Sequence, residues 1–304
     1  MTNAAPTTSP TGDLTVFGMD ISTIIISILV PLFLTIFGVW LATKWRDKLR
    51  VRIVPKLNSK QFGQLSALYC ERVPYYERVP PNHFRAFFRR EHSTKSVREF
   101  RRRINQTTAP VHLLLVARTS EGICGFIKAI FIPDVRFLFI AYLVTAPGKN
   151  HEERTVTQKL VSYLFAVCRN SAINSIVYEI CSEPQSKYKA KARLFRHYAS
   201  ALGVQLHRIA AKYQQPEICS FDAGDCKLMS AELYIAHVGN QTQNAWRSIA
   251  RDEYKKLVSA IYKYVYLMSY ALAEPQLTEK YRDFLQRVMR NLFAGIRNKA
   301  IDLQ

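Results

Sequence analysis

The sequence predicts an α+β fold: a mixed, mostly antiparallel sheet flanked by helices, with one N-terminal transmembrane helix and a C-terminal helical hairpin. Three observations lead to this prediction. A long uncharged run lies near the start of the chain, strand-like and helix-like segments follow one another irregularly through its middle, and two long helical patterns close it.

The chain has the composition of a globular protein with a strong positive charge. Among its 304 residues, 43 Lys and Arg stand against 23 Asp and Glu, a formal net charge of +20, and 48% are hydrophobic. This balance leaves little room for disorder beyond residues 1–20, which are rich in Thr and Pro and which we expect to be disordered. The charge favours anionic partners, whether phosphorylated ligands, lipid headgroups or nucleic acid.

Residues 21–43 are predicted to form a transmembrane helix. The run is uncharged and about 23 residues long, enough to cross about 30 Å of hydrocarbon. Pro31 within it is tolerated in a membrane helix, where it produces a kink. A cleaved signal peptide is the alternative, but it needs a basic start, a shorter apolar core and a small-residue cleavage site, none of which is present. We therefore expect an uncleaved anchor.

The charges on either side of this run set its predicted orientation. Asp13 and Asp20 precede the run, whereas six Lys and Arg side chains lie within residues 44–56. The positive-inside rule then puts the N-terminus outside and everything after Thr43 in the cytoplasm. The prediction is a single-pass membrane protein whose basic flank meets membrane lipids.

Residues 49–237 supply the α+β domain, and their hydrophobic periodicity defines its elements. Ser59 is the predicted cap of the first helix, and residues 214–216 fall in a polar loop between the last two strands. The predicted order is a strand at 50–56, helices at 59–73, 82–92 and 96–104, strands at 111–118, 123–132 and 136–146, a helix at 152–170, a strand at 175–180, a helix ending at Gly203, and strands at 204–213 and 227–237.

Residues 245–304 form the predicted C-terminal helical region. Helical patterns cover residues 246–272 and 277–301, joined by the breaker AEPQ, and the second pattern carries an apolar stripe. Such a stripe must be buried. It packs either on the domain itself or on a second subunit, which would make the protein a homo-oligomer.

The six cysteines give no sign of a metal site. They are scattered without a CxxC pair or any metal-ligand spacing. Several lie inside apolar segments, where a free cysteine behaves as a small hydrophobic residue. We therefore expect all six to be reduced.

Three segments resemble the GNAT superfamily of acyl-CoA-dependent N-acyltransferases. They are the strand FLFIAYLVTAP with the loop and helix that follow it, the strand SIVYEI ending near Glu179, and RLFRHYASALGV followed by AAKYQQP. The resemblance covers residues 49–237. It implies a GNAT-like domain that takes acetyl-CoA or another acyl-CoA as co-substrate and needs no metal.

The resemblance also implies where acyl-CoA would bind. In the family a central strand pairs with the pantetheine amides, and the start of the next helix binds the pyrophosphate. The matching residues here are Val144, Lys149, Arg154, Thr155 and Thr157. Two threonines replace glycines that normally let the phosphates approach the backbone. Either the hydroxyls and basic side chains hold the phosphates instead, or the loop no longer binds acyl-CoA in the usual way.

Acyl transfer to an amine needs a base for the amine and an acid for the departing thiolate. Glu179 stands where the family often keeps its base, and Tyr198 resembles the tyrosine that protonates the CoA sulfur. Each has a structural alternative. Glu179 can be a strand-end carboxylate paired with a Lys or Arg, and Tyr198 can be a core aromatic of an amphipathic helix.

The first functional hypothesis is therefore a membrane-anchored N-acyltransferase that transfers an acyl group, most simply acetyl, from acyl-CoA to an amine at the cytoplasmic face. The alternative is a non-catalytic GNAT-like ligand-sensing or scaffold protein at the membrane, which the altered phosphate loop favours. Nucleic acid is not an expected partner, because no nucleic-acid motif is recognised and anionic lipid already accounts for the basic residues.

Overall fold

The computed structural model describes residues 15–16, 19–20, 35, 49–74, 78–89, 94–148, 150–169, 171–182, 185–217, 226–238 and 247–304. The chain divides into two compact units, Met1–Lys48 and Leu49–Gln304. In the first unit, β1 (Thr15–Val16) pairs with β2 (Met19–Asp20). The predicted membrane helix at 21–43 lies outside the described residues apart from Thr35. None of the helices within the described residues has the length and apolar character needed to span a bilayer.

The second unit is built on a sheet that has eight strands within the described residues. All neighbouring strands are antiparallel except β6 and β7, which are parallel. The predicted α+β class with a mostly antiparallel mixed sheet is confirmed. The strand order is β3 (Arg50–Ile53), β4 (Val111–Arg118), β5 (Ile123–Ile132), β6 (Phe137–Thr145), β7 (Ser175–Cys181), β10 (Leu228–His237) and β8 (Leu206–Arg208), with β9 (Tyr213–Pro216) also paired to β10.

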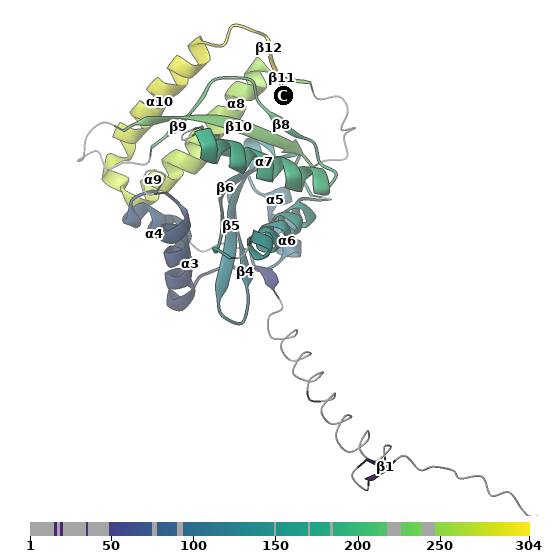
Figure 1. The fold of residues 1–304 in the computed structure, drawn as a ribbon. Helices are drawn as coiled ribbons and strands as arrows, with labels where there is room; N and C mark the ends of the chain where they lie inside the picture. The colour runs from purple at the N-terminus through teal and green to yellow at the C-terminus, as the bar shows by residue number, and fades with distance from the viewer. Residues whose placement is uncertain are drawn as a thin grey trace, which may run out of the picture. The chain divides into compact units, whose positions relative to one another are not determined.

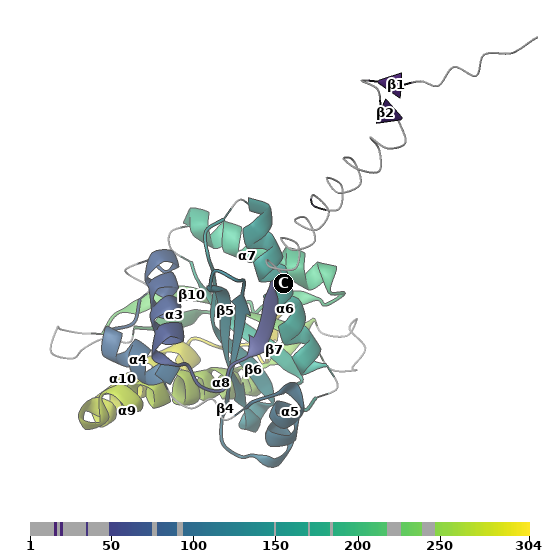
Figure 2. The ribbon, with the colours of Figure 1, turned by 90° about the horizontal axis from the view of Figure 1, so that it is seen from below.

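Helices cover both faces of this sheet (Figures 1 and 2). One face carries α3 (Ser59–Arg72), α4 (Pro81–Arg89) and the C-terminal helices, and the other carries α5 (Val97–Gln106), α6 (Asn150–Cys168) and α7 (Gln185–Ala201). Phe126 of β5 packs into the first core and Ile127 into the second. Because both faces are buried, the central strands read as continuous apolar runs.

Local signals set the ends and spacing of the helices. The cap of α3 is Asn58, not the predicted Ser59: its side chain accepts from the Gln61 amide at 2.8 Å, and the Gln61 side chain accepts from the Asn58 amide at 3.1 Å. Gly203 after α7 has φ +67°, which confirms the predicted left-handed cap. A Cβ at Gly125 would lie 2.9 Å from Val156 Cγ1, so glycine lets α6 pack closely on β5.

The C-terminal region is more varied than a pair of helices. One long helix runs through α8 (Arg251–Ile261), the π-helical turn η6 (Tyr262–Leu267) and α9 (Met268–Ala273). The short 3-10 turn η7 (Pro275–Leu277) leads into α10 (Thr278–Ala294). The predicted start of the first helix and the predicted end of the second are wrong. Two short strands lie there instead, β11 (Ser248–Ala250) and β12 (Ala300–Asp302), and they pair with each other. A strand of three residues is too short to interrupt the helical periodicity of the sequence, so neither strand was predicted.

The apolar stripe of α10 is buried within the chain itself. Tyr281, Leu285, Val288 and Leu292 belong to the same hydrophobic core as the side chains of α3 and α4. The aromatic ring of Tyr281 stacks on that of Tyr270 of α9, with centroids 4.1 Å apart. The C-terminal helices therefore share one compact unit with residues 49–237, and the stripe is covered without a second subunit.

Two further predictions are wrong. Tyr213–Pro216 is not a strand end and loop but the strand β9, which pairs with Leu228–Ala231 of β10. Cys226 takes part in a disulfide bond, although all cysteines were expected to be reduced. Among the free thiols, Cys168 and Cys181 are buried as expected, whereas Cys70 is exposed.

Candidate active site

The parallel strands β6 and β7 separate halfway along their length. They pair from Phe137 opposite Ser175 to Ile140 opposite Tyr178, and the pairing stops there. Beyond this point residues 142–145 pair only with β5, and residues 179–181 only with β10, within the described part of the chain. An irregularity in the β5–β6 register leaves Ala141 without an opposite residue at the start of the divergence. Within the described residues, the β6 backbone thus offers polar groups without a strand partner to the gap between the strands.

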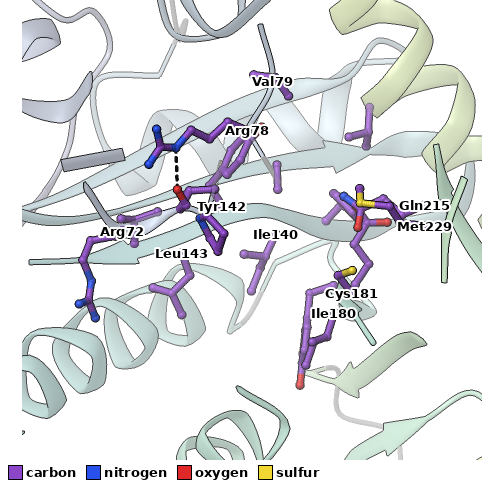
Figure 3. A pocket seen from close by; sticks show the side chains of 18 of the residues that line it. Arg72, Arg78, Val79, Ile140, Tyr142, Leu143, Ile180, Cys181, Gln215 and Met229 are labelled. Carbon is purple, nitrogen blue, oxygen red and sulfur yellow. Dashed lines mark hydrogen bonds between the residues drawn. The ribbon is translucent and has the colours of Figure 1, made fainter. Parts of the chain in front are cut away.

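A cavity of about 740 Å³ occupies this gap. Its walls come from the diverging halves of β6 and β7 and from β9, β10, α3, α4, α6, α7 and the turn η6 with the start of α9. Figure 3 shows the side chains of Tyr142, Leu143, Cys181, Gln215 and Met229 around it. The volume is that of an organic ligand site, and mainly apolar walls with a few polar groups are typical of such sites.

Glu179 is the carboxylate that lines this cavity where the two strands diverge; Glu153 and Glu217 line other parts of it. Glu179 lies on β7 just past the last parallel pair. The Tyr213 hydroxyl of β9 donates to its Oε2 at 2.6 Å, and the Tyr266 hydroxyl of η6 donates to its Oε1. The expected alternative was an ion pair with a Lys or Arg. Its described hydrogen-bond donors are instead two neutral phenols.

This environment shifts the proton affinity of Glu179 strongly. Burial raises the pKa of the carboxyl to about 7, and the hydrogen bonds from Tyr213 and Tyr266 lower it in part. Burial also raises the pKa of both phenols well above 10, so both stay protonated and act as donors. A carboxyl with a pKa near neutrality can both take up and release a proton at physiological pH, which is what a general base requires.

Tyr198, the residue matched to the proton donor, is not among the described residues that line the cavity. It is on α7, almost fully buried, and its hydroxyl donates to the Arg154 carbonyl of α6 at 3.2 Å. Burial raises its pKa above the usual value. The described α7 residues that line the cavity are Leu194 and Phe195. The role of Tyr198 stays a prediction from the resemblance.

Some of the residues matched to the phosphate site line the cavity, and others do not. Val144 and Thr157 line the cavity and are buried, and the Thr157 hydroxyl donates to the Glu153 carbonyl at 2.9 Å within α6. Arg154 and Thr155 are exposed on α6 and are not among the cavity-lining residues described. Lys149 lies outside the described residues. Only part of the predicted set therefore meets the cavity.

An acidic side chain instead lies beside the cavity at the start of α6. Glu153 Oε1 accepts a hydrogen bond from Arg72 of α3 and lies 3.4 Å from the Thr145 hydroxyl at the end of β6. Arg72 and Glu153 are each about one-third exposed, at 34% and 33%. Arg78 also lines the cavity, but it donates to the Val73 carbonyl at 2.6 Å and to the Cys70 carbonyl. Arg72 is therefore the cation most accessible to a ligand here.

Sequence reasoning missed several residues of this site. Tyr213 had been placed at the end of a predicted strand, and no role had been assigned to Tyr266, Arg72 or Glu153. His83 of α4 also lines the cavity: its ring lies 4.9 Å from that of Tyr270, and burial lowers its pKa. The only available signal for Tyr266 was the recurrence of tyrosine every four residues along an apolar helix.

No known protein-family profile matches the chain, and no curated protein sequence does. Solved acetyltransferase structures do match it. An N-acetyltransferase from Staphylococcus aureus Mu50 is 9% identical over 63% of this chain and 99% of that chain, with a TM-score of 0.40. Diaminobutyrate acetyltransferase from Paenibacillus lautus, in complex with its substrate and coenzyme A, is 13% identical over 64% and 99%, with a TM-score of 0.42.

A third match is a putative acetyltransferase from Salmonella typhimurium with acetyl-CoA. It is 13% identical, covers 66% of this chain and 99% of that chain, and has a TM-score of 0.36. The chain's own strand topology agrees with the mixed, mostly antiparallel sheet that the sequence predicted. An irregular β6 separates from a parallel β7, and the start of α6 follows directly.

Proposed function

We propose that this protein is an acyl-CoA-dependent N-acyltransferase, with acetyl as the simplest acyl group and an amine as acceptor. The observation that carries the proposal is the divergence of β6 from β7 around a cavity, with Glu179 in its wall. The unpaired edge at residues 141–145 suits the extended, amide-containing pantetheine arm, because strand edges recognise extended chains through main-chain hydrogen bonds. An acyl thioester placed along this edge would lie beside β7.

The chain's residues then supply the proton chemistry. Glu179 accepts a proton from the ammonium form of the acceptor, and the neutral amine attacks the thioester carbonyl. The carbon–sulfur bond breaks, the attacking nitrogen gives up its second proton as the amide forms, and the departing thiolate takes up one proton, so that the proton left on Glu179 is released to solvent. Tyr198 is the donor that the family resemblance implies. Its bond to the Arg154 carbonyl would have to open for this step.

The start of α6 is the part of the site that fits acyl-CoA least well. A diphosphate there would meet the Glu153 carboxylate as well as the N-terminal end of the helix. We propose that the diphosphate competes with Glu153 for Arg72, with Thr155 and Arg154 contributing from the exposed side of α6. Lys149 is included on the family resemblance alone. Binding would then separate the Arg72–Glu153 pair rather than fill an empty phosphate site.

The membrane anchor belongs to the same proposal. Residues 21–43 would hold the domain at the cytoplasmic leaflet with the N-terminus outside, so an amine near anionic lipid becomes the acceptor. The Cys226 disulfide argues against a cytoplasmic domain, because disulfides are rare in reducing compartments. A reporter fused after Gln304 decides the orientation: activity only in the cytoplasm supports the proposal, and glycosylation at Asn105 in a eukaryotic host contradicts it.

A thiol-release assay tests the enzyme activity directly. Full-length protein in membranes is mixed with acetyl-CoA and a panel of primary amines, and free CoA thiol is measured. We expect amine-dependent release that falls about a hundredfold or more in Glu179→Gln. Glu121→Gln, on the exposed turn after β4, is the matched control and should keep wild-type turnover. Absence of acetyl-CoA binding at millimolar concentration would end the proposal.

The alternative is a non-catalytic, ligand-sensing protein of the same fold. The observation in its favour is the Arg72–Glu153 pair beside the start of α6, where a working phosphate site would be expected. This alternative predicts saturable acyl-CoA binding without thiol release for any amine. It also predicts that Glu179→Gln leaves the binding constant unchanged.

A further inference from the structure

The long C-terminal helix contains a π-helical turn in its middle. The turn η6 spans Tyr262–Leu267, and the residues on either side, Ile261 and Met268, keep ordinary right-handed helical angles. The helix therefore continues through the turn without a break. Single π turns inside α-helices are uncommon, and they occur frequently at functional sites because the extra residue redirects the side chains that follow. What this turn directs is visible in its hydrogen bonds.

The turn directs two tyrosines toward the end of the sheet that holds the cavity. Tyr262 donates its hydroxyl to the Gln214 carbonyl of β9, and Tyr266 donates to Oε1 of Glu179 on β7. The rings of these two tyrosines meet edge to face, with centroids 5.9 Å apart. The ring of Tyr213 lies 6.1 Å from that of Tyr262, and its hydroxyl holds Oε2 of Glu179. Two tyrosines from two elements thus hold one carboxylate, and Tyr262 packs against both of them.

Both oxygens of Glu179 are therefore fixed by donors that are far away in the sequence. Tyr213 comes from the sheet, and Tyr266 comes from a helix 87 residues beyond Glu179. A carboxylate oxygen that accepts one hydrogen bond keeps one lone pair for a substrate proton. With both oxygens held, those lone pairs have a defined direction. The cavity also touches Val265 and Ser269, so the same helix forms part of its wall.

We propose that Tyr266 is a positioning residue for Glu179, so that the C-terminal helix, through its π turn, completes the candidate active site. The proposal rests on the proposed function for its chemical meaning, although the contact itself does not depend on it. Tyr266 acts through Glu179 and touches no reacting atom. The hydrogen bond from Tyr266 has two consequences. It orients the Glu179 carboxylate, and it lowers the pKa of this buried group, because a donor to the carboxylate stabilises the ionised state.

The environment of Glu179 contains several groups besides Tyr266. Burial is the largest influence on its pKa, followed by the hydrogen bonds of Tyr213 and then of Tyr266. His83, Arg72 and Arg78 line the same cavity. The phenols whose own pKa values respond to its charge are Tyr142 on β6, Tyr213 on β9, Tyr262 and Tyr266 on η6, and Tyr281 on α10.

The test is a direct titration of Glu179 in the full-length protein. Glutamate is labelled with ¹³C at the side-chain carboxyl, and the Glu179 resonance is assigned from its loss in Glu179→Gln. Tyr266→Phe keeps the ring and removes one donor to the carboxylate. A hydrogen bond to a charged group is worth about 1 to 2 pH units, so the midpoint should rise by about one unit or more. Tyr213→Phe should raise it as well.

Tyr262→Phe is the matched control. It lies on the same π turn and loses one buried hydroxyl bond, but that bond goes to a backbone carbonyl of β9. Its Glu179 midpoint should equal that of the wild type. Equal midpoints in wild type and Tyr266→Phe, or equal shifts in Tyr266→Phe and Tyr262→Phe, would overturn the proposal. A shift seen only in Tyr213→Phe would also overturn it, because Tyr213 alone would then hold the base.

The titration needs no turnover, so it separates this proposal from the proposed function. If thiol release is found, the acid limb of its kcat/KM profile should move upward in Tyr266→Phe by the same amount as the NMR midpoint. If no amine supports release while the midpoints shift as expected, the acyltransferase is refuted and the positioning contact stands.

Discussion

Replacing the Glu179 carboxylate with an uncharged isostere should stabilise the protein at neutral and alkaline pH. Glu179→Gln keeps the size and shape of the side chain and removes its charge. In the wild type this charge is buried among two tyrosines, with no cation among its described hydrogen-bond partners. The native protein therefore carries a destabilising charge whenever Glu179 is ionised, as residues selected for chemistry often do.

The magnitude follows from the pKa of this carboxyl. Burial raises it from 4.5 to about 7, which at about 1.4 kcal/mol per pH unit corresponds to about 3 kcal/mol. Between pH 4.5 and 7 the native state holds a proton that the unfolded state has released. The free energy of unfolding therefore falls as pH rises through this window and levels off above it. The loss of one ideal hydrogen bond to a tyrosine reduces the net gain of the variant by about 1 kcal/mol.

The assay is guanidinium denaturation at half-unit steps from pH 4.5 to 9. We expect wild type and Glu179→Gln to be nearly equal at pH 4.5 and the variant to be about 2 to 3 kcal/mol more stable at pH 8. Glu121→Gln, on an exposed turn, should follow the wild type at every pH. A difference that does not change with pH, or a variant that becomes less stable at high pH, would refute the reasoning.

Three further predictions concern the packing and the phosphate end. Glu153→Gln should tighten acetyl-CoA binding severalfold in calorimetry, because it removes a negative charge beside Arg72, whereas Glu279→Gln on α10 should not; weaker binding would contradict the competition. Gly125→Ala should cost about 1 to 3 kcal/mol in denaturation because its Cβ meets Val156, while Gly63→Ala, with open space, should gain about 0.5 to 1 kcal/mol. Deleting residues 245–304 should give insoluble protein, since α10 covers the core; a soluble product would show an independent tail.

The sequence predicted the sheet well because the central strands carry strong local signals. The strands at 111–118 and 123–132 have the predicted bounds, since each is an apolar run between clear turn residues. The short strands were not predicted, because they lack such a local signal. The strands β9, β11 and β12 have three or four residues each, and their pairing depends on distant partners rather than on a local pattern.

The candidate site was predictable only in part. A carboxylate at the end of the strand SIVYEI was visible, and the family resemblance gave it a role. Its environment was not visible, because Tyr266 lies 87 residues away and reaches Glu179 through a π turn that has no sequence signature. Arg154 and Thr155 were expected to face the ligand. Helical periodicity in α6 instead turns Glu153 and Thr157 toward the cavity.

Hydrogen exchange in the presence of acetyl-CoA tests most directly the claim that this ligand binds between the diverging strands. Full-length protein is exchanged with and without saturating acetyl-CoA, and amide protection is read by mass spectrometry. The account predicts slower amide exchange at residues 141–145 of β6 and around Glu179, with little change in β3 and β4, which lie at one edge of the sheet. Unchanged exchange at residues 141–145, or protection confined to another part of the chain, would contradict it.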